Sequence, residues 1–214
     1  MVEKILSLDM STKTGWALLN SMPTGIVLLE YGKLEQIHTP EGAYPESFIK
    51  WAYSVFEKIR DVILAKNPDV VVLEETSAGS KAIYTQKILE WIHFLVAQLV
   101  VDMGLKVIYI LTEEWRRETG CLISKEEKKR NKEVREYKKK NASKIAYDKD
   151  GKRIGKITRK HVNIRRANEV FAEFLKEPLR KKDEDTADSL LLAYCYHLRR
   201  LRSSEEIQSQ KVQS

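Results

Sequence analysis

The chain has 214 residues, of which 43% are hydrophobic and 32% are charged, and its formal net charge is +7. This length and composition fit one large globular domain, or one domain with an insertion, and exclude a disordered chain. No apolar run is long enough to span a membrane, and we expect neither a signal peptide nor an anchor, hence a cytoplasmic protein. The two cysteines lack metal-ligand spacing, so we expect reduced thiols.

The positive charge is concentrated in one segment. Residues 121–160 hold sixteen Lys or Arg and six Asp or Glu, a net charge of +10, so the rest of the chain carries −3. A basic segment on a mildly acidic body favours contact with a polyanion such as nucleic acid. A solvated charged helix would have the same composition.

The first part of the sequence predicts three strands in an antiparallel meander and then a helix. A short apolar run ends in Asp9, and small hydroxyl residues with Gly15 follow it as a tight turn. A second strand is expected over residues 16–19 and a third over 25–35, and the short connection between them makes this pair antiparallel. Apolar residues then recur at helical spacing over 46–66, where an Asn-Pro pair ends the helix.

The middle of the chain predicts two further strands joined by a long helix. Residues 69–74 form the clearest strand, a β-branched run that ends in the carboxylates of Glu74 and Glu75. A long apolar helix over 82–103 leads to a fifth strand over 106–111. Crossover helices make the first, fourth and fifth strands parallel. We therefore expect an α/β fold with a five-stranded mixed sheet, an antiparallel meander plus parallel strands, flanked by helices.

The last part of the chain predicts helices and one hairpin. These elements are a polar helix that begins with a Ser124–Glu127 capping box, a hairpin over 144–154, a helix over 161–175, a last helix over 183–201 and a disordered tail over 203–214. We interpret residues 1–202 as a single domain, with a basic helix-hairpin insertion at about 121–160.

Four carboxylates are expected to meet at one end of this sheet. Asp9 ends the first strand and Glu74 ends the fourth, and parallel neighbouring strands bring their carboxyl ends side by side. Asp185 and Asp188 are three residues apart at the start of the last helix, which places both on one helical face. Each acid alone has a structural explanation, since acids favour the first turn of a helix and the loops after strands. Their coincidence in a sheet of this order favours a site.

The chemistry of these four acids points to metal binding. Carboxylates this close raise one another's pKa unless cations neutralise them. The set contains only oxygen ligands, with no paired His or Cys. We therefore expect two Mg²⁺ or Mn²⁺ ions rather than zinc.

Several short motifs carry a resemblance to a known family. They are residues 5–11 (ILSLDMS), 72–75 (VLEE) and 185–190 (DTADSL), with Pro-Asp at 68–69 and Glu-Trp-Arg at 114–116. On these motifs the chain resembles the RuvC-like Holliday-junction resolvases of the RNase H-like (retroviral integrase) superfamily, and it looks closest to the phage-type members. The resemblance covers nearly the whole chain except residues 121–160.

The resemblance implies an RNase H-like fold and a metal-dependent endonuclease that acts as a homodimer on four-way or branched DNA. Asp9 would bridge both metal ions and Glu74 would ligate one of them. Asp185 and Asp188 would complete the ligand set. Paired phosphodiester hydrolysis would leave 5′-phosphate and 3′-hydroxyl ends.

Residues near the four acids and on the basic segment are candidate DNA contacts. The bacterial enzymes have Gln directly after the glutamate and an aromatic residue three positions after it, whereas this chain has Glu75 and Ser77. Phosphate contacts from the basic segment would position DNA without reading its bases. The residues that we expect to contact DNA are Ser11, Lys13, Ser77, Lys81, Arg116, Arg117, Lys125, Lys128, Lys129, Arg130 and Lys160.

Other functions are compatible with parts of the pattern. Actin-like and sugar-kinase folds open with a similar strand and Asp turn, but they need a second domain and a glycine-rich phosphate loop, and this chain has only 9 glycines. A closer alternative keeps the nuclease chemistry and changes the substrate to a flap, an RNA–DNA hybrid or RNA. A third alternative is a non-catalytic junction-binding protein. The four acids argue against it, because without metal they would repel phosphate.

Overall fold

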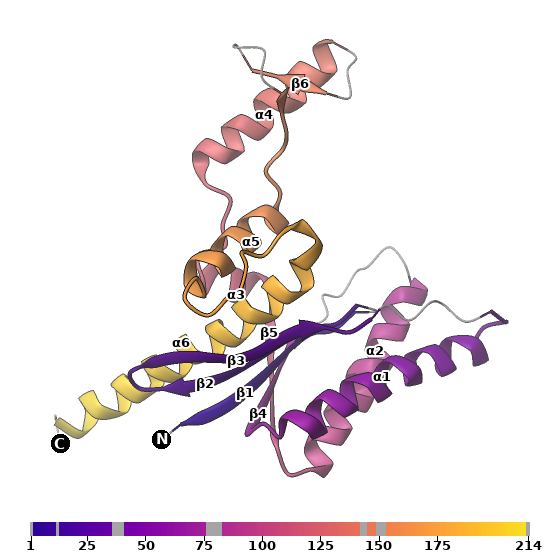
Figure 1. The fold of residues 1–214 in the computed structure, drawn as a ribbon, viewed down its shortest axis with the longest axis vertical. Helices are drawn as coiled ribbons and strands as arrows, with labels where there is room; N and C mark the ends of the chain where they lie inside the picture. The colour runs from indigo at the N-terminus through magenta and orange to yellow at the C-terminus, as the bar shows by residue number, and fades with distance from the viewer. Residues whose placement is uncertain are drawn as a thin grey trace.

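A five-stranded mixed sheet forms the centre of the protein in the computed structural model, which describes residues 2–11, 13–35, 41–75, 83–141, 145–148 and 153–212. The strand order is β3-β2-β1-β4-β5, with β1 antiparallel to β2 and parallel to β4 (Figure 1). The strands are β1 (Glu3–Asp9), β2 (Gly15–Met22), β3 (Gly25–Lys33), β4 (Val70–Glu75) and β5 (Lys106–Leu111). The predicted meander and parallel strands are therefore confirmed.

Helices cover both faces of this sheet (Figure 1). One face packs against α1 (Glu46–Lys66) and α2 (Ile83–Asp102), and the other packs against α6 (Glu184–Val212). Two shorter helices, α3 (Thr112–Glu118) and α5 (Arg159–Val170), lie on the α6 side, and the short 3₁₀ turn η1 (Lys181–Asp183) precedes α6. Each face has its own buried apolar cluster, as expected for an α/β layered fold.

The alternation of side chains along β1 determines which face receives the acids. Ile5 and Ser7 point toward α6, whereas Leu6 and Leu8 point toward α1 and α2. Because the side-chain period of a strand is two, Asp9 follows Ile5 and Ser7 onto the α6 face. Thus β1 carries its carboxylate toward α6, whose first turn contains Asp185.

The alternation of side chains along β4 likewise determines the face on which Glu74 lies. Val70 and Val72 belong to the apolar cluster beneath α6, so Glu74 lies on that face as well. The parallel register places Leu8 of β1 opposite Leu73 of β4. Asp9 and Glu74 are the next residues on these two adjacent strands, so both lie at the same end of the sheet.

A basic arm projects from this body (Figure 1). We call α4 (Lys125–Lys140) and the hairpin of β6 (Ala146–Tyr147) and β7 (Arg153–Ile154) the arm. Val134 and Ala146 are fully buried within it. Asn131 fixes the base of the arm, because its amide donates to the carbonyl of Ile157 at 2.7 Å and accepts from the Ile157 N–H at 2.8 Å. The arm lies within residues 121–160, which we interpret as an insertion, and residues 149–152 of the expected hairpin lie outside the described residues.

Two helix ends differ from the prediction. Helix α5 ends at Val170 rather than near residue 175, and α6 continues to Val212 through residues that we expected to be disordered. No Gly or Pro follows Leu201 to end the helix, and the hydroxyls of Ser203 and Ser204 bond to carbonyls four residues back. Within the described part of the chain, no helix is both long and apolar enough to cross a membrane.

Candidate active site

Asp9 lies at the centre of a group of carboxylates. It ends β1 and faces α6, where its side chain is half-buried. Burial raises the pKa of Asp9 well above its usual value, and the nearby charges of Asp188, Glu74 and Asp185 raise it further. The charge of the Arg116 guanidinium lowers the pKa of Asp9 and so opposes this shift. The other three predicted acids therefore share one electrostatic environment with Asp9.

Glu74 is held by two donors from α3. The hydroxyl of Thr112 donates to Oε1, and the indole Nε1 of Trp115 donates to Oε2 at 2.8 Å. These donors lie beside Glu74 because β4 pairs with β5, and α3 begins directly after β5. Trp115 is fully buried, so its indole N–H needs a partner, which Glu74 supplies.

Asp188 is held between α5 and α3. Its Oδ1 accepts a hydrogen bond of 2.8 Å from the amide of Asn163, and its Oδ2 lies 3.9 Å from the guanidinium of Arg116. Burial raises the pKa of Asp188 to about 7, although the Asn163 hydrogen bond and the Arg116 charge both lower it. This carboxyl is therefore only partly compensated by the protein.

Asp185 lies in the first turn of α6, near three lysines. Burial raises its pKa, as does the charge of Glu184, whereas the charges of Lys160, Lys33 and Lys13 lower it. Lys160 also forms an ion pair with Glu184. Positive side chains therefore surround the outer edge of the acidic group.

The start of α6 is fixed against the sheet at two points. The hydroxyl of Ser7 donates to the carbonyl of Ser189 at 2.7 Å. Gly15 lies directly against the backbone of Asp185, where a Cβ atom would be 2.1 Å from the carbonyl oxygen. These contacts set the position of Asp185 and Asp188 relative to Asp9.

The four acids have the chemistry of a magnesium site. They supply oxygen ligands only, and the raised pKa values of Asp9 and Asp188 indicate buried negative charge that a cation would stabilise. Among the described residues, no three Asp, Glu, His or Cys side chains lie close enough together to hold one ion. Glu74 and Asp188 are instead bonded to protein donors. Since Mg²⁺ keeps several waters and takes few direct carboxylates, the donor set fits this ion.

A basic cleft of about 440 Å³ is lined by Arg116, whose guanidinium lies 3.9 Å from Asp188. Its basic lining residues are Arg116, Arg117, Lys128 and Arg159, and Cys121, Leu122, Ile123 and Glu113 complete the wall. The guanidinium of Arg116 packs on the ring of Trp115 at 4.9 Å, and its Nε is buried without a hydrogen-bond partner among the described residues. A half-buried, incompletely paired guanidinium is suited to an anion.

The other predicted DNA contacts fall into separate places. Lys125, Lys129 and Arg130 are exposed on the arm, and Lys13 and Lys160 lie near Asp185. The hydroxyl of Ser11 accepts from the Lys13 N–H within the turn after β1. Ser77 and Lys81 lie outside the described residues.

The sequence pattern did not identify several residues of the site. Asn163, Gly15 and Arg159 were not singled out as site residues, and Trp115 was noted only as part of a motif. A polar residue inside the apolar face of α5 was a usable signal for Asn163, because buried amides need partners. For the contact between Gly15 and the Asp185 backbone, the sequence offered no indication except that Gly15 lies in a turn.

Known structures share this fold, whereas the sequence matched no protein-family model and no curated protein. A structure of Thermus thermophilus RuvC in complex with a Holliday junction substrate has a TM-score of 0.59 at 12% identity, covering 94% of this chain and 96% of that chain. A second Thermus thermophilus RuvC structure has a TM-score of 0.56 at 13% identity, with 93% and 96% covered. The yeast mitochondrial Holliday junction resolvase Ydc2 has a TM-score of 0.54 at 12% identity, with 97% and 84% covered. The predicted RuvC-like, RNase H-like fold is thus confirmed.

Proposed function

We propose that this chain is a divalent-metal-dependent endonuclease that resolves four-way or branched DNA. The observation that carries the proposal is the convergence of four carboxylates from β1, β4 and α6 on one face of the sheet. Asp9 and Glu74 lie at the carboxyl ends of parallel strands, where α/β proteins hold their ligands. Asp185 and Asp188 lie at the start of α6, near enough for their charges to raise the pKa of Asp9. The fold itself supports the substrate class, since one similar structure contains a Holliday junction substrate and another is a Holliday junction resolvase.

Two Mg²⁺ or Mn²⁺ ions would be held by these acids, Asp9 and Glu74 from the sheet and Asp185 and Asp188 from α6. When bound, such ions polarise the scissile phosphate and activate water for phosphodiester hydrolysis, which would leave 5′-phosphate and 3′-hydroxyl ends. Thr112 and Trp115 orient Glu74 for this task, because both of its oxygens accept hydrogen bonds from α3. The protein thus contributes oriented oxygens in a half-buried site.

The basic cleft is the proposed route of the DNA backbone to the acids. Arg116 lies between the cleft and Asp188, and its buried Nε has an unused donor. Arg117, Lys128 and Arg159 form no ion pair with any described acid, so their charge is available for phosphate. Such contacts fix the position of the strand and carry no sequence information.

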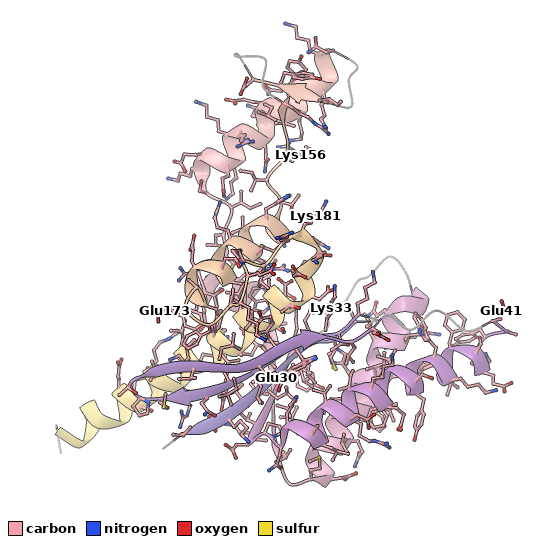
Figure 2. The ribbon with its side chains drawn as sticks, viewed as in Figure 1. Glu30, Lys33, Glu41, Lys156, Glu173 and Lys181 are labelled. Atoms are coloured by element: carbon pink, nitrogen blue, oxygen red, sulfur yellow. The ribbon has the colours of Figure 1, made fainter. Side chains whose placement is uncertain are left out.

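The arm would extend this backbone contact away from the site. Lys125, Lys129 and Arg130 are exposed on α4. Figure 2 shows Lys156 where the arm joins the body and Lys181 on the neighbouring part of the body. The ion pair of 2.7 Å between Arg165 and Glu127 links α5 to α4. An arm braced in this way would present its positive charge to a DNA branch in a defined direction.

A second copy of the chain would supply the second site that paired cleavage needs. The outer face of α1 and α2 exposes Ile49, Tyr53 and Phe94 around a shallow apolar cleft of about 350 Å³. Exposed apolar patches of this kind mark interaction surfaces. A twofold dimer through this face would place two identical sites on one junction.

The test of this function is cleavage of a labelled four-way junction beside linear duplex, flap and RNA–DNA hybrid. Each substrate is incubated with Mg²⁺, with Mn²⁺ and with chelator. We expect paired nicks near the branch point that disappear in chelator and in the variants Asp9→Asn and Asp188→Asn. Glu75→Gln is the matched control, because Glu75 follows Glu74 but is exposed and points to the other face of the sheet.

The outcomes separate the alternatives. Cleavage of the flap or hybrid instead of the junction would retain the site and change the substrate. Tight junction binding without cleavage under either metal would mean that the chain is a binding protein and that the four acids are not a nuclease site.

A further inference from the structure

Asn163 occupies a place where an apolar side chain would be expected. It lies on α5 between Val162 and Ile164, both buried, and Asn163 itself is 1% exposed. Burying a carboxamide costs free energy unless its donors and acceptor are paired. A leucine of similar size would avoid this cost, so we looked for an interaction that requires the amide at this position.

The amide makes one hydrogen bond and leaves another group unpaired. Its Nδ2 donates to Asp188 Oδ1 at 2.8 Å. The NH₂ group, and not the carbonyl, therefore faces Asp188. The Asn163 Oδ1 is buried and has no hydrogen-bond partner in the described part of the chain. The cost of this half-paired amide is therefore offset by a single bond to Asp188.

Helix α5 holds Asn163 in a fixed position. Asn168 accepts from the Leu179 N–H at 2.7 Å and donates to the Leu179 carbonyl at 3.1 Å. On another side, Arg166 Nε donates to the carbonyl of Thr119 at 2.8 Å. The Asn163 amide is thus carried by a helix that is tied to its surroundings through side-chain hydrogen bonds.

We propose that Asn163 is a positioning residue that fixes the Asp188 carboxylate in the orientation needed to bind a divalent ion. This inference rests on the proposed function. Asn163 does not touch the substrate and acts through Asp188.

The test separates metal binding from folding. Asn163→Leu keeps most of the volume and removes the donor, and Asn163→Ala removes the donor with less risk of steric conflict. Mn²⁺ affinity is measured by calorimetry, and the free energy of unfolding is measured by urea titration in chelator. We expect Mn²⁺ affinity to fall roughly 10-fold or more in both variants, the usual effect of losing a hydrogen-bond partner of a metal ligand. Asn163→Leu removes an unpaired buried carbonyl but also leaves Asp188 Oδ1 without its donor. We therefore expect its free energy of unfolding in chelator to stay close to that of the wild type.

Val162→Ala is the matched control, because Val162 is the buried neighbour of Asn163 on the same helix. It should lower stability and leave Mn²⁺ affinity unchanged. Wild-type Mn²⁺ affinity in both Asn163 variants would overturn the inference and leave the proposed function intact. A wild-type chain that binds no Mn²⁺ would instead overturn the proposed metal site, and the inference with it.

Discussion

Gly15 packs so closely on Asp185 that a Cβ atom at Gly15 would lie 2.1 Å from the Asp185 carbonyl oxygen and 2.8 Å from the Thr186 backbone nitrogen. These neighbours are backbone atoms, so they cannot move aside without shifting the start of α6. The glycine is therefore required by space, and it determines how near Asp185 and Asp188 come to β1.

Gly15→Ala should separate α6 from the sheet at the site. We expect a decrease of about 1–3 kcal/mol in the free energy of unfolding, typical of overpacking, together with loss of metal-dependent cleavage. Urea titration and junction cleavage measure the two effects. Gly155→Ala is the control, since a Cβ at Gly155 would meet no atom of the described residues within 4 Å. Full activity in Gly15→Ala would contradict this account of α6.

The raised pKa of Asp188 predicts an unusual dependence of stability on pH. Its pKa is about 7 in the folded protein, and that of Asp9 is also raised. Because the folded state binds these protons more tightly than the unfolded state, the metal-free protein should become less stable as the pH rises from about 4 to about 7. One such group contributes at most about 1.4 kcal/mol per pH unit.

Asp188→Asn tests this assignment. The variant lacks the buried charge, so in chelator at a pH above 7 it should be more stable than the wild type, and its stability should depend less on pH. Added Mg²⁺ should stabilise the wild type and leave the variant nearly unchanged. Urea titrations at several pH values compare the two proteins. If the stability of the wild type and of Asp188→Asn depended equally on pH, groups other than Asp188 would cause that dependence.

The convergence of Asp9 and Glu74 was predictable because it follows from strand order and a period of two. The apolar runs identify both strands, the crossover helix makes them parallel, and alternation puts both acids on one face. Apolar runs, a crossover helix and side-chain alternation can each be recognised in a short stretch of sequence, so the positions of both acids could be predicted from it.

The partners of these acids were not predictable in the same way. Trp115 reaches Glu74 from 41 residues away and Asn163 reaches Asp188 from 25 residues away. Such contacts depend on the angle at which α3 and α5 pack on the sheet, which no local pattern encodes. The length of α6 was also missed, because a polar helix end and a disordered tail have similar composition.

The two donors on Glu74 lead to a prediction for α3. Thr112→Val nearly preserves shape and removes the hydroxyl that donates to Oε1. We expect Mn²⁺ affinity or cleavage to fall roughly 10-fold and stability to fall by about 1–3 kcal/mol, because Glu74 is left with an unpaired oxygen. Thr112→Ser restores a hydroxyl and should recover both. A serine variant as impaired as the valine variant would point to packing of the methyl group instead.

The arm should contribute to DNA affinity through charge alone. Reversal of Lys125, Lys128, Lys129 and Arg130 to Glu should weaken junction binding and reduce the salt slope by about 0.9 for each phosphate that is no longer neutralised. Anisotropy measured in chelator, over about 50–200 mM salt, gives this slope without cleavage. Lys50→Glu is the control, since Lys50 is exposed on α1 across the sheet. An unchanged salt slope in the arm variant would exclude these phosphate contacts.

The apolar face of α1 and α2 leads to a prediction about assembly. Phe94 is 66% exposed at the edge of the cleft that Ile49 and Tyr53 also line. Phe94→Glu should convert a dimer into a monomer in sedimentation velocity experiments. It should leave the unfolding of the monomer nearly unchanged, because the side chain is not part of the core.

Loss of the dimer should also change the pattern of cleavage, since one junction would then meet one site at a time and paired nicks would become single nicks. Leu29→Glu is the control for added charge, because Leu29 is exposed on the edge strand β3 and belongs to neither α1 nor α2. A stable interface needs about 1,200–2,000 Å² of buried surface, so the patch must engage neighbouring parts of both helices. A wild-type chain that stays monomeric on the junction would exclude this face as the dimer contact.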